Sequence, residues 1–229
     1  MFNYYGRKGR IIKFYPAPKY DFIVEPFAGS ASYATAYSNR NIILNDLDES
    51  VYRAWRCIIG STRDQIRLLP EPVKGESLSD YDLTEDERSL IAFTLSAGAF
   101  RSTSCSQWAA EHQLTRLMKD KVLKHHLHFK RWKIFNKDYR ELDDYEATWF
   151  IDPPYMSGGE YYIKNKINYR ELAAWCKSRR GQVIVCENGK ADWLPFVPLV
   201  YTRGVKTIGN TKKKTIELIW TNYERKEWK

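Results

Sequence analysis

The residue types best suited to chemistry stand together in Asp152-Pro153-Pro154-Tyr155, directly after the apolar run Trp149-Phe150-Ile151. Two consecutive prolines cannot continue a central strand, so the backbone leaves a sheet there in a fixed shape. A carboxylate, a carbonyl and an aromatic ring then lie at the carboxyl edge of a strand, where open α/β sheets bind ligands. The tetrapeptide predicts two hydrogen-bond acceptors beside a ring. The alternative is a rigid turn with a capping Asp and a packed Tyr.

Two other groups of residues lie where predicted strands end. Glu25-Pro26-Phe27-Ala28-Gly29-Ser30 follows the first apolar run; its small residues let the backbone approach a ligand, and a following helix N-terminus favours negative charge. Asp46 ends the second run, where an acidic side chain commonly accepts hydrogen bonds from ribose, although capping a helix is the commoner role. The absence of GxGxxG disfavours a nicotinamide-dependent dehydrogenase. Three such groups in sheet-compatible order indicate one ligand site.

The elements that must position these residues alternate as in a parallel α/β sheet. Apolar residues recur at helical spacing after the capping residue Asp48, and a second helix over 169–179 has Asn168 and Glu171 in capping positions. The fold class is therefore α/β, with a mostly parallel sheet flanked by helices. We expect its strands over 21–27, 41–46, 134–135, 147–151, 182–186, 199–202 and 215–220.

The middle of the chain interrupts this alternation. Residues 60–82 are rich in Pro, Gly, Ser and charge, and Thr84-Glu85-Asp86-Glu87 is a capping box that begins another helix. Residues 107–132 are helical in composition and strongly basic. We expect a small helical lobe over 60–132, inserted into a domain made of residues 1–59 and 133–229.

Composition bounds the class of protein. The 229 residues suffice for a large core, and 43% hydrophobic with 28% charged residues excludes a disordered chain. The apolar runs are too short to span a membrane and no signal peptide is recognisable, so we expect a cytoplasmic protein. The net charge of +9 favours a polyanionic partner, though only weakly. Cysteines at 57, 105, 176 and 186 lack paired spacing and predict reduced, mostly buried thiols.

Six segments together share the order and spacing of one known family: Tyr4-Tyr5-Gly6-Arg7-Lys8, Val24 to Ser30, Leu44 to Asp48, Asn136 to Tyr139, Phe150 to Tyr155, and Lys214 to Tyr223. The chain resembles the Dam-like (D12 class) DNA adenine-N6 methyltransferases, which use S-adenosylmethionine. The resemblance implies a Rossmann-like methyltransferase sheet, a helical target-recognition lobe and double-stranded DNA as partner. It also implies a bacterial or phage-encoded protein, for which we favour a monomer.

The resemblance assigns roles to matching positions. Asp152, Pro153, Pro154 and Tyr155 would form the catalytic pocket. Phe27 to Ser30 would pass under the methionine part of the cofactor, Asp46 would hold its ribose, and Asp138 and Tyr139 would contact its adenine. The complete set of expected cofactor-binding residues is Tyr4, Tyr5, Lys8, Glu25, Pro26, Phe27, Ala28, Gly29, Ser30, Asp46, Asp138 and Tyr139.

The chemistry of adenine agrees with this assignment. Its exocyclic amine is conjugated with the ring, so the nitrogen lone pair is a poor nucleophile. The Asp152 carboxylate and the Pro153 carbonyl can accept both N–H groups and turn the lone pair toward the sulfonium methyl for in-line transfer. Because the amine is out of reach inside a duplex, the base must be flipped out, and Tyr155 would stack on it.

Target recognition departs from the family pattern. Residues 95–104 lack the Asn-Arg segment of GATC-specific enzymes, so we do not carry that specificity over. His125, His126 and His128 lie in a Lys-rich run, which favours a solvated, DNA-facing surface over a metal site. A glycine-containing flap over 158–162 and a basic loop over 204–214 are further candidates for base and phosphate contacts. The expected DNA-binding residues are Arg101, Arg116, Lys124, Lys130, Arg131, Lys212 and Lys213.

Three alternatives remain open. The same chemistry could act on cytosine N4 or on adenine in RNA, since the tetrapeptide alone excludes neither. The third is a catalytically inactive DNA-binding relative, against which the intact Asp152-Pro153-Pro154-Tyr155 argues. The recognition sequence, and whether the chain belongs to a restriction-modification system, cannot be inferred from the sequence.

Overall fold

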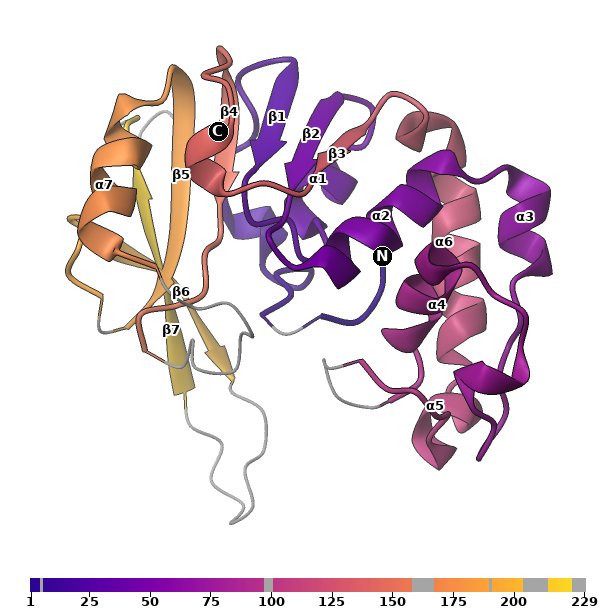
Figure 1. Cartoon of the computed structure of the whole chain (residues 1–229). Helices are drawn as coiled ribbons and strands as arrows, with labels where there is room; N and C mark the ends of the chain where they lie inside the picture. The colour runs from indigo at the N-terminus through magenta and orange to yellow at the C-terminus, as the bar shows by residue number, and fades with distance from the viewer. Residues whose placement is uncertain (5, 97–100, 158–166, 190, 204–213, 224–229) are drawn as a thin grey trace.

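Seven strands form one sheet in the order β3-β2-β1-β4-β5-β7-β6 (Figure 1). In this computed structural model the described residues are 1–4, 6–96, 101–157, 167–189, 191–203 and 214–223. β7 runs antiparallel to both of its neighbours, and the other pairings are parallel. The strands are β1 (Phe22–Glu25), β2 (Asn41–Asn45), β3 (Lys133–Phe135), β4 (Ala147–Ile151), β5 (Gly181–Asn188), β6 (Val197–Arg203) and β7 (Lys214–Thr221). The expected mostly parallel α/β sheet is therefore confirmed.

Local capping signals place the helices as the sequence predicts. Asp48 accepts the Ser50 N–H at the start of α2, Thr84 forms a capping box with Glu87, and Asn168 caps α7. The helices are α1 (Ser32–Ala36), α2 (Glu49–Gly60), α3 (Arg63–Leu68), α4 (Glu85–Ala92), α5 (Gln107–Glu111), α6 (Leu114–Phe129) and α7 (Tyr169–Ser178), with 3-10 turns η1 (Ile12–Phe14), η2 (Leu78–Asp80) and η3 (Tyr139–Glu141).

The two faces of the sheet bury different side chains because successive residues of a strand point to opposite sides. On one face, Ile23 belongs to the same core cluster as Trp55 of α2. On the other face, Val24 and Trp149 share a second cluster with Leu172 of α7. All four cysteines are free and buried, as expected. Among the described residues, no helix is long and apolar enough to cross a membrane.

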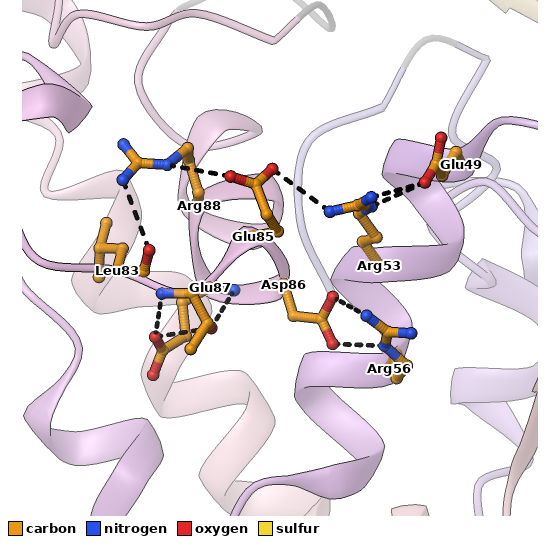
Figure 2. Close-up of polar contacts among 9 residues, drawn as sticks. Glu49, Arg53, Arg56, Leu83, Glu85, Asp86, Glu87 and Arg88 are labelled. Carbon is orange, nitrogen blue, oxygen red and sulfur yellow. Dashed lines mark hydrogen bonds and ion pairs between the residues drawn. The ribbon is translucent and has the colours of Figure 1, made fainter.

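Ion pairs join α2 to α4 of the middle segment (Figure 2). Arg56 holds Asp86 with two hydrogen bonds, of 2.5 and 2.6 Å. Arg53 bridges Glu49 on its own helix, at 2.6 Å, and Glu85 on α4, at 3.3 Å. Such exposed pairs contribute little stability, because water and salt screen them. Because α2 begins directly after Asp48 at the end of β2, the position of α4 is coupled to that edge of the sheet.

The basic segment 107–132 differs from its prediction in two ways. It is divided at Gln113, whose φ of +48° ends α5 and lets α6 begin at the next residue. The expectation of a solvated surface is wrong for His126, which is buried and has Nε2 2.9 Å from the Ser61 carbonyl oxygen. Lys119 of the same run is also buried and donates to the Glu71 carboxylate at 2.8 Å. Both side chains hold α6 against the chain that leaves α2.

Candidate active site

A pocket opens at the carboxyl ends of β1 and β4, the two central neighbours from which the chain winds in opposite directions. This is the switch point at which open α/β sheets bind ligands. Its wall comes from the N-terminal segment, the turns after β1 and β2, and the segments after β3 and β4. Predicted residues that line it are Tyr4, Lys8, Glu25, Pro26, Phe27, Ala28, Gly29, Ser30, Asp46, Asp138, Tyr139, Asp152 and Pro154. Tyr5 lies outside the described residues.

The turn after β1 is held open by its neighbours. Gly29 has a φ of +45°, and a Cβ placed there would lie 2.7 Å from the Tyr4 ring. Its N–H donates to the Asp46 carboxylate at 2.9 Å, and its carbonyl accepts the Trp55 indole N–H at 2.8 Å. The absence of a side chain at Gly29 therefore lets Tyr4 close over the turn, while Asp46 and Trp55 fix the backbone below it.

Glu25 is a buried acid at the start of this turn. Burial raises the pKa of Glu25 to about 8, although its carboxylate accepts the Ala34 N–H at 2.6 Å. Ala34 belongs to α1, which has five residues and begins after Ala31 without a side-chain cap. The acidic group at this helix end is Glu25 of the chain itself, and the expectation that the helix end favours negative charge stays a prediction.

Two asparagines of the family-like segments, to which the sequence assigned no role, hold the turns at the base of the pocket. Asn45, buried at the end of β2, donates to the carbonyls of Pro26 and Lys137, both at 3.0 Å. Asn136 donates to the Asp46 carbonyl at 2.7 Å. The turns after β1, β2 and β3 are thus joined side by side. An amide can donate and accept at once, which is what three converging backbone segments require.

Asp138 and Tyr139 follow β3 and line the same pocket. Asp138 caps η3 and makes two hydrogen bonds to the Arg140 guanidinium, at 2.8 and 2.9 Å. That hydrogen bonding lowers the pKa of Asp138. The Tyr139 ring packs 5.4 Å from the Phe27 ring and 5.1 Å from Trp175 of α7. The result is an aromatic floor with a fixed negative charge at its rim.

The tetrapeptide leaves the sheet at the end of β4 and is fastened on its far side. The Tyr169 hydroxyl donates to the Pro154 carbonyl at 2.8 Å. The next residue but one, Met156, donates its N–H to Glu187 of β5 at 3.1 Å. Asp152 and Pro154 line the pocket, whereas Pro153 and Tyr155 do not. The flap expected over 158–162 lies outside the described residues.

Lys8 reaches Asp152 from the N-terminal segment. Composition did not predict that this lysine would be buried. Its Nζ lies 2.9 Å from the Asp152 carboxylate and 3.7 Å from Glu217. Burial acts to lower the pKa of Lys8, but the two carboxylates outweigh it and raise the pKa above its ordinary value. Burial raises the pKa of Asp152, an effect that Lys8 opposes. The site is therefore a cluster at the pocket edge in which one buried cation is shared by two carboxylates.

The basic residues expected to contact DNA differ in their surroundings. Arg101, Arg116, Lys124, Lys130 and Arg131 are all exposed. Lys130 donates to the Ser61 carbonyl at 2.9 Å beyond the end of α2, and Arg131 donates to the Asn39 carbonyl at 3.0 Å. These two side chains hold backbone as well as presenting charge. Lys212 and Lys213 lie outside the described residues.

The sheet order, with its pocket at the switch point, defines an α/β Rossmann-like methyltransferase fold. Residues 8–86 match the family model of the D12 class N6 adenine-specific DNA methyltransferases, which confirms the resemblance seen in the sequence. The matched stretch includes the turn after β1, Asp46 and α2, while the tetrapeptide lies beyond it. No curated protein matches the chain. Among the described residues, no group of three His, Cys, Asp or Glu side chains is arranged to hold a metal ion.

Proposed function

We propose that the protein transfers a methyl group from S-adenosylmethionine to the N6 amine of an adenine in double-stranded DNA. The observation that carries this proposal is the position of Asp152. Its carboxylate ends β4 and lines the same pocket as the glycine turn after β1. A methyl donor held by that turn and an amine held by Asp152 would meet inside one pocket.

The residues around the pocket fit S-adenosylmethionine. Gly29 and Tyr4 line the side of the pocket that would receive the methionine part, and the buried Glu25 carboxyl would take up its charged form beside the ammonium of that part. Asp46 stands where ribose hydroxyls would donate, and the Phe27 and Tyr139 rings offer a flat apolar surface for adenine. The bound sulfonium would supply an activated methyl group. Acidic residues around the pocket favour a cation of this kind.

The acceptor side would act through position rather than covalent chemistry. The Asp152 carboxylate and the Pro153 carbonyl would accept the two N–H groups of the amine and direct its lone pair toward the methyl group. Asp152 is also the nearest base for the proton that the methylated nitrogen releases. The Tyr155 ring would stack on the flipped adenine, and its hydroxyl is held by Glu217 at 2.7 Å.

The helical segment 60–132 would hold the duplex. Arg101, Arg116 and Lys124 are exposed on it and can contact phosphates without taking part in the catalytic cluster. The ion pairs between α2 and α4 would join that surface to the helix that follows β2 (Figure 2). The domain division at residues 60 and 132 is part of this proposal.

The experiment is methyl transfer from labelled cofactor to mixed-sequence duplex DNA, comparing the wild-type protein with Asp152→Ala. We expect the variant to stay folded and to lose label transfer by several orders of magnitude. Asp143→Ala, at an exposed residue that precedes β4 and so lies away from the carboxyl ends of the strands, is a matched control that should transfer normally. Near-normal methyl transfer by Asp152→Ala would contradict this mechanism. Label found on cytosine would make cytosine the methyl acceptor in place of adenine. Label found on RNA but not on DNA would make RNA the substrate.

A further inference from the structure

Glu217 reaches the tetrapeptide from the last strand of the sheet. Its Oε1 accepts hydrogen bonds from the hydroxyls of Tyr155, at 2.7 Å, and Tyr15, at 2.6 Å, and its residue surface is 8% exposed. The same oxygen lies 3.7 Å from the Lys8 ammonium. A carboxylate this buried needs compensation, which here comes from two phenols and one cation. Its place beside Asp152 is not explained by packing of β7.

Lys8 stands where the target amine would have to bind. Its ammonium contacts the Asp152 carboxylate at 2.9 Å and lies 4.6 Å from the centroid of the Tyr155 ring. These are the two contacts that the proposed function gives to the flipped base. An ammonium with several N–H donors satisfies Asp152 as the amine would. Movement of Lys8 away from Asp152 would free the Asp152 carboxylate and the Tyr155 ring for the amine.

We propose that Glu217 is a positioning residue that takes over the Lys8 ammonium from Asp152 when the target amine enters, while it keeps the Tyr155 ring in place. The inference rests on the proposed function and assigns a residue to its acceptor step. No bond is made or broken in this transfer, since the ammonium only exchanges one carboxylate partner for another.

Keeping the Lys8 ammonium inside the site costs less free energy than releasing it into solvent. If Lys8 moved into solvent, Glu217 would remain as a buried charge with two phenol donors but no cation, which is unfavourable. Closing the gap from 3.7 Å to ordinary hydrogen-bond distance needs a shift of about 1 Å, within reach of a lysine side chain. The Lys8–Glu217 pair would then be neutral, and the full charge of Asp152 would face the amine.

The test compares the effect of Glu217→Gln with and without Lys8. Gln keeps the size and an oxygen that the two phenols can donate to, but it removes the charge. We expect Glu217→Gln to lower single-turnover methyl transfer at saturating cofactor about tenfold or more in the wild-type background, because Lys8 then stays on Asp152. In the Lys8→Met background the same substitution should change the rate less than about twofold. Equal losses in both backgrounds would overturn the proposal and leave Glu217 a structural support of Tyr155.

A matched control uses the neighbouring buried acid. Glu187 on β5 accepts the Met156 N–H and the Trp193 indole N–H, at 3.1 and 3.0 Å, and supports the same loop through other contacts. Glu187→Gln should therefore lower methyl transfer by the same factor whether or not Lys8 is present. If the rate loss caused by Glu187→Gln also disappears in the Lys8→Met background, then removing Lys8 compensates for substitutions around the site in general. That result would contradict the specific role of Glu217.

A readout independent of turnover separates this inference from the proposed function. If the wild-type protein transfers no methyl group to DNA, the proposed function fails. The same four proteins, unfolded in denaturant, then decide whether Glu217 holds Lys8. We expect the shifts in unfolding midpoint to be non-additive, with the double variant more stable than the sum of the two losses predicts. Additive shifts would mean that the ammonium has no functional or energetic link to Glu217, and would overturn the inference.

Discussion

The Asp46 carboxylate accepts the backbone N–H of Gly29 at 2.9 Å and so joins the ends of β1 and β2 directly. Its other oxygen accepts the Asp48 N–H at 2.9 Å, just before α2 begins. An acid at the end of a second strand therefore does two jobs in this fold. It sets the shape of the glycine turn, and it lines the pocket that the turn forms.

The first prediction concerns the room left at Gly29. Gly29→Ala would bring a Cβ within 2.7 Å of the Tyr4 ring and place it at a φ of +45°. We expect cofactor affinity, measured by calorimetry, to fall by at least about tenfold as Tyr4 is displaced.

Gly75→Ala is its matched control. Gly75 also has a positive φ, of +88°, but an added Cβ would meet nothing within 4 Å. This variant should be less stable than wild type because of its backbone strain, with unchanged cofactor affinity. If both variants bind cofactor as tightly as wild type, the contact of Tyr4 with Gly29 does not shape the pocket.

The second prediction follows from the buried Glu25. Burial raises the pKa of Glu25 from 4.5 to about 8, so between these values the folded state holds a proton that the unfolded state has lost. The free energy of unfolding should therefore decrease as pH rises through this window, by up to about 1.4 kcal/mol per pH unit from this group. Above pH 8 its contribution should level off.

Glu25→Gln isolates this effect. The amide oxygen can still accept the Ala34 N–H but no longer titrates. The difference in unfolding free energy between wild type and variant, measured by denaturant titration from pH 5 to 9, should favour the variant increasingly up to about pH 8. A difference that does not change with pH would mean that Glu25 titrates normally.

The third prediction concerns salt, which should weaken DNA binding to the basic surface of the helical segment far more than cofactor binding in the acidic pocket. Arg116→Ala and Lys124→Ala should each weaken binding to duplex DNA and reduce the slope of log affinity against log salt by about one. Cofactor affinity should respond far less to salt because the pocket is partly enclosed and acidic. Lys177→Ala, exposed on α7, serves as the control with an unchanged slope. Unchanged slopes in both lobe variants would place the duplex elsewhere.

The sequence predicted the parallel sheet well because its strands are short apolar runs and its helices begin with clear caps such as Asp48 and Asn168. It could not predict partners brought together by long-range folding. Asn45 and Lys137 are separated by 92 positions, and Tyr155 and Glu217 by 62. The buried state of Lys119 and His126 was missed for a similar reason. In a basic helix, composition does not show which side meets the neighbouring α3 and the end of α2.

We propose that this protein methylates adenine N6 in DNA, and that the Asp152 carboxylate is essential because it accepts a hydrogen bond from the target amine. The most direct measurement is a map of modified bases in DNA from cells that express the wild-type chain or Asp152→Ala. We predict N6-methyladenine that is absent from cells without the chain and from cells with the variant. No new methylated base with the wild-type chain, or equal methylation with Asp152→Ala, would contradict the account.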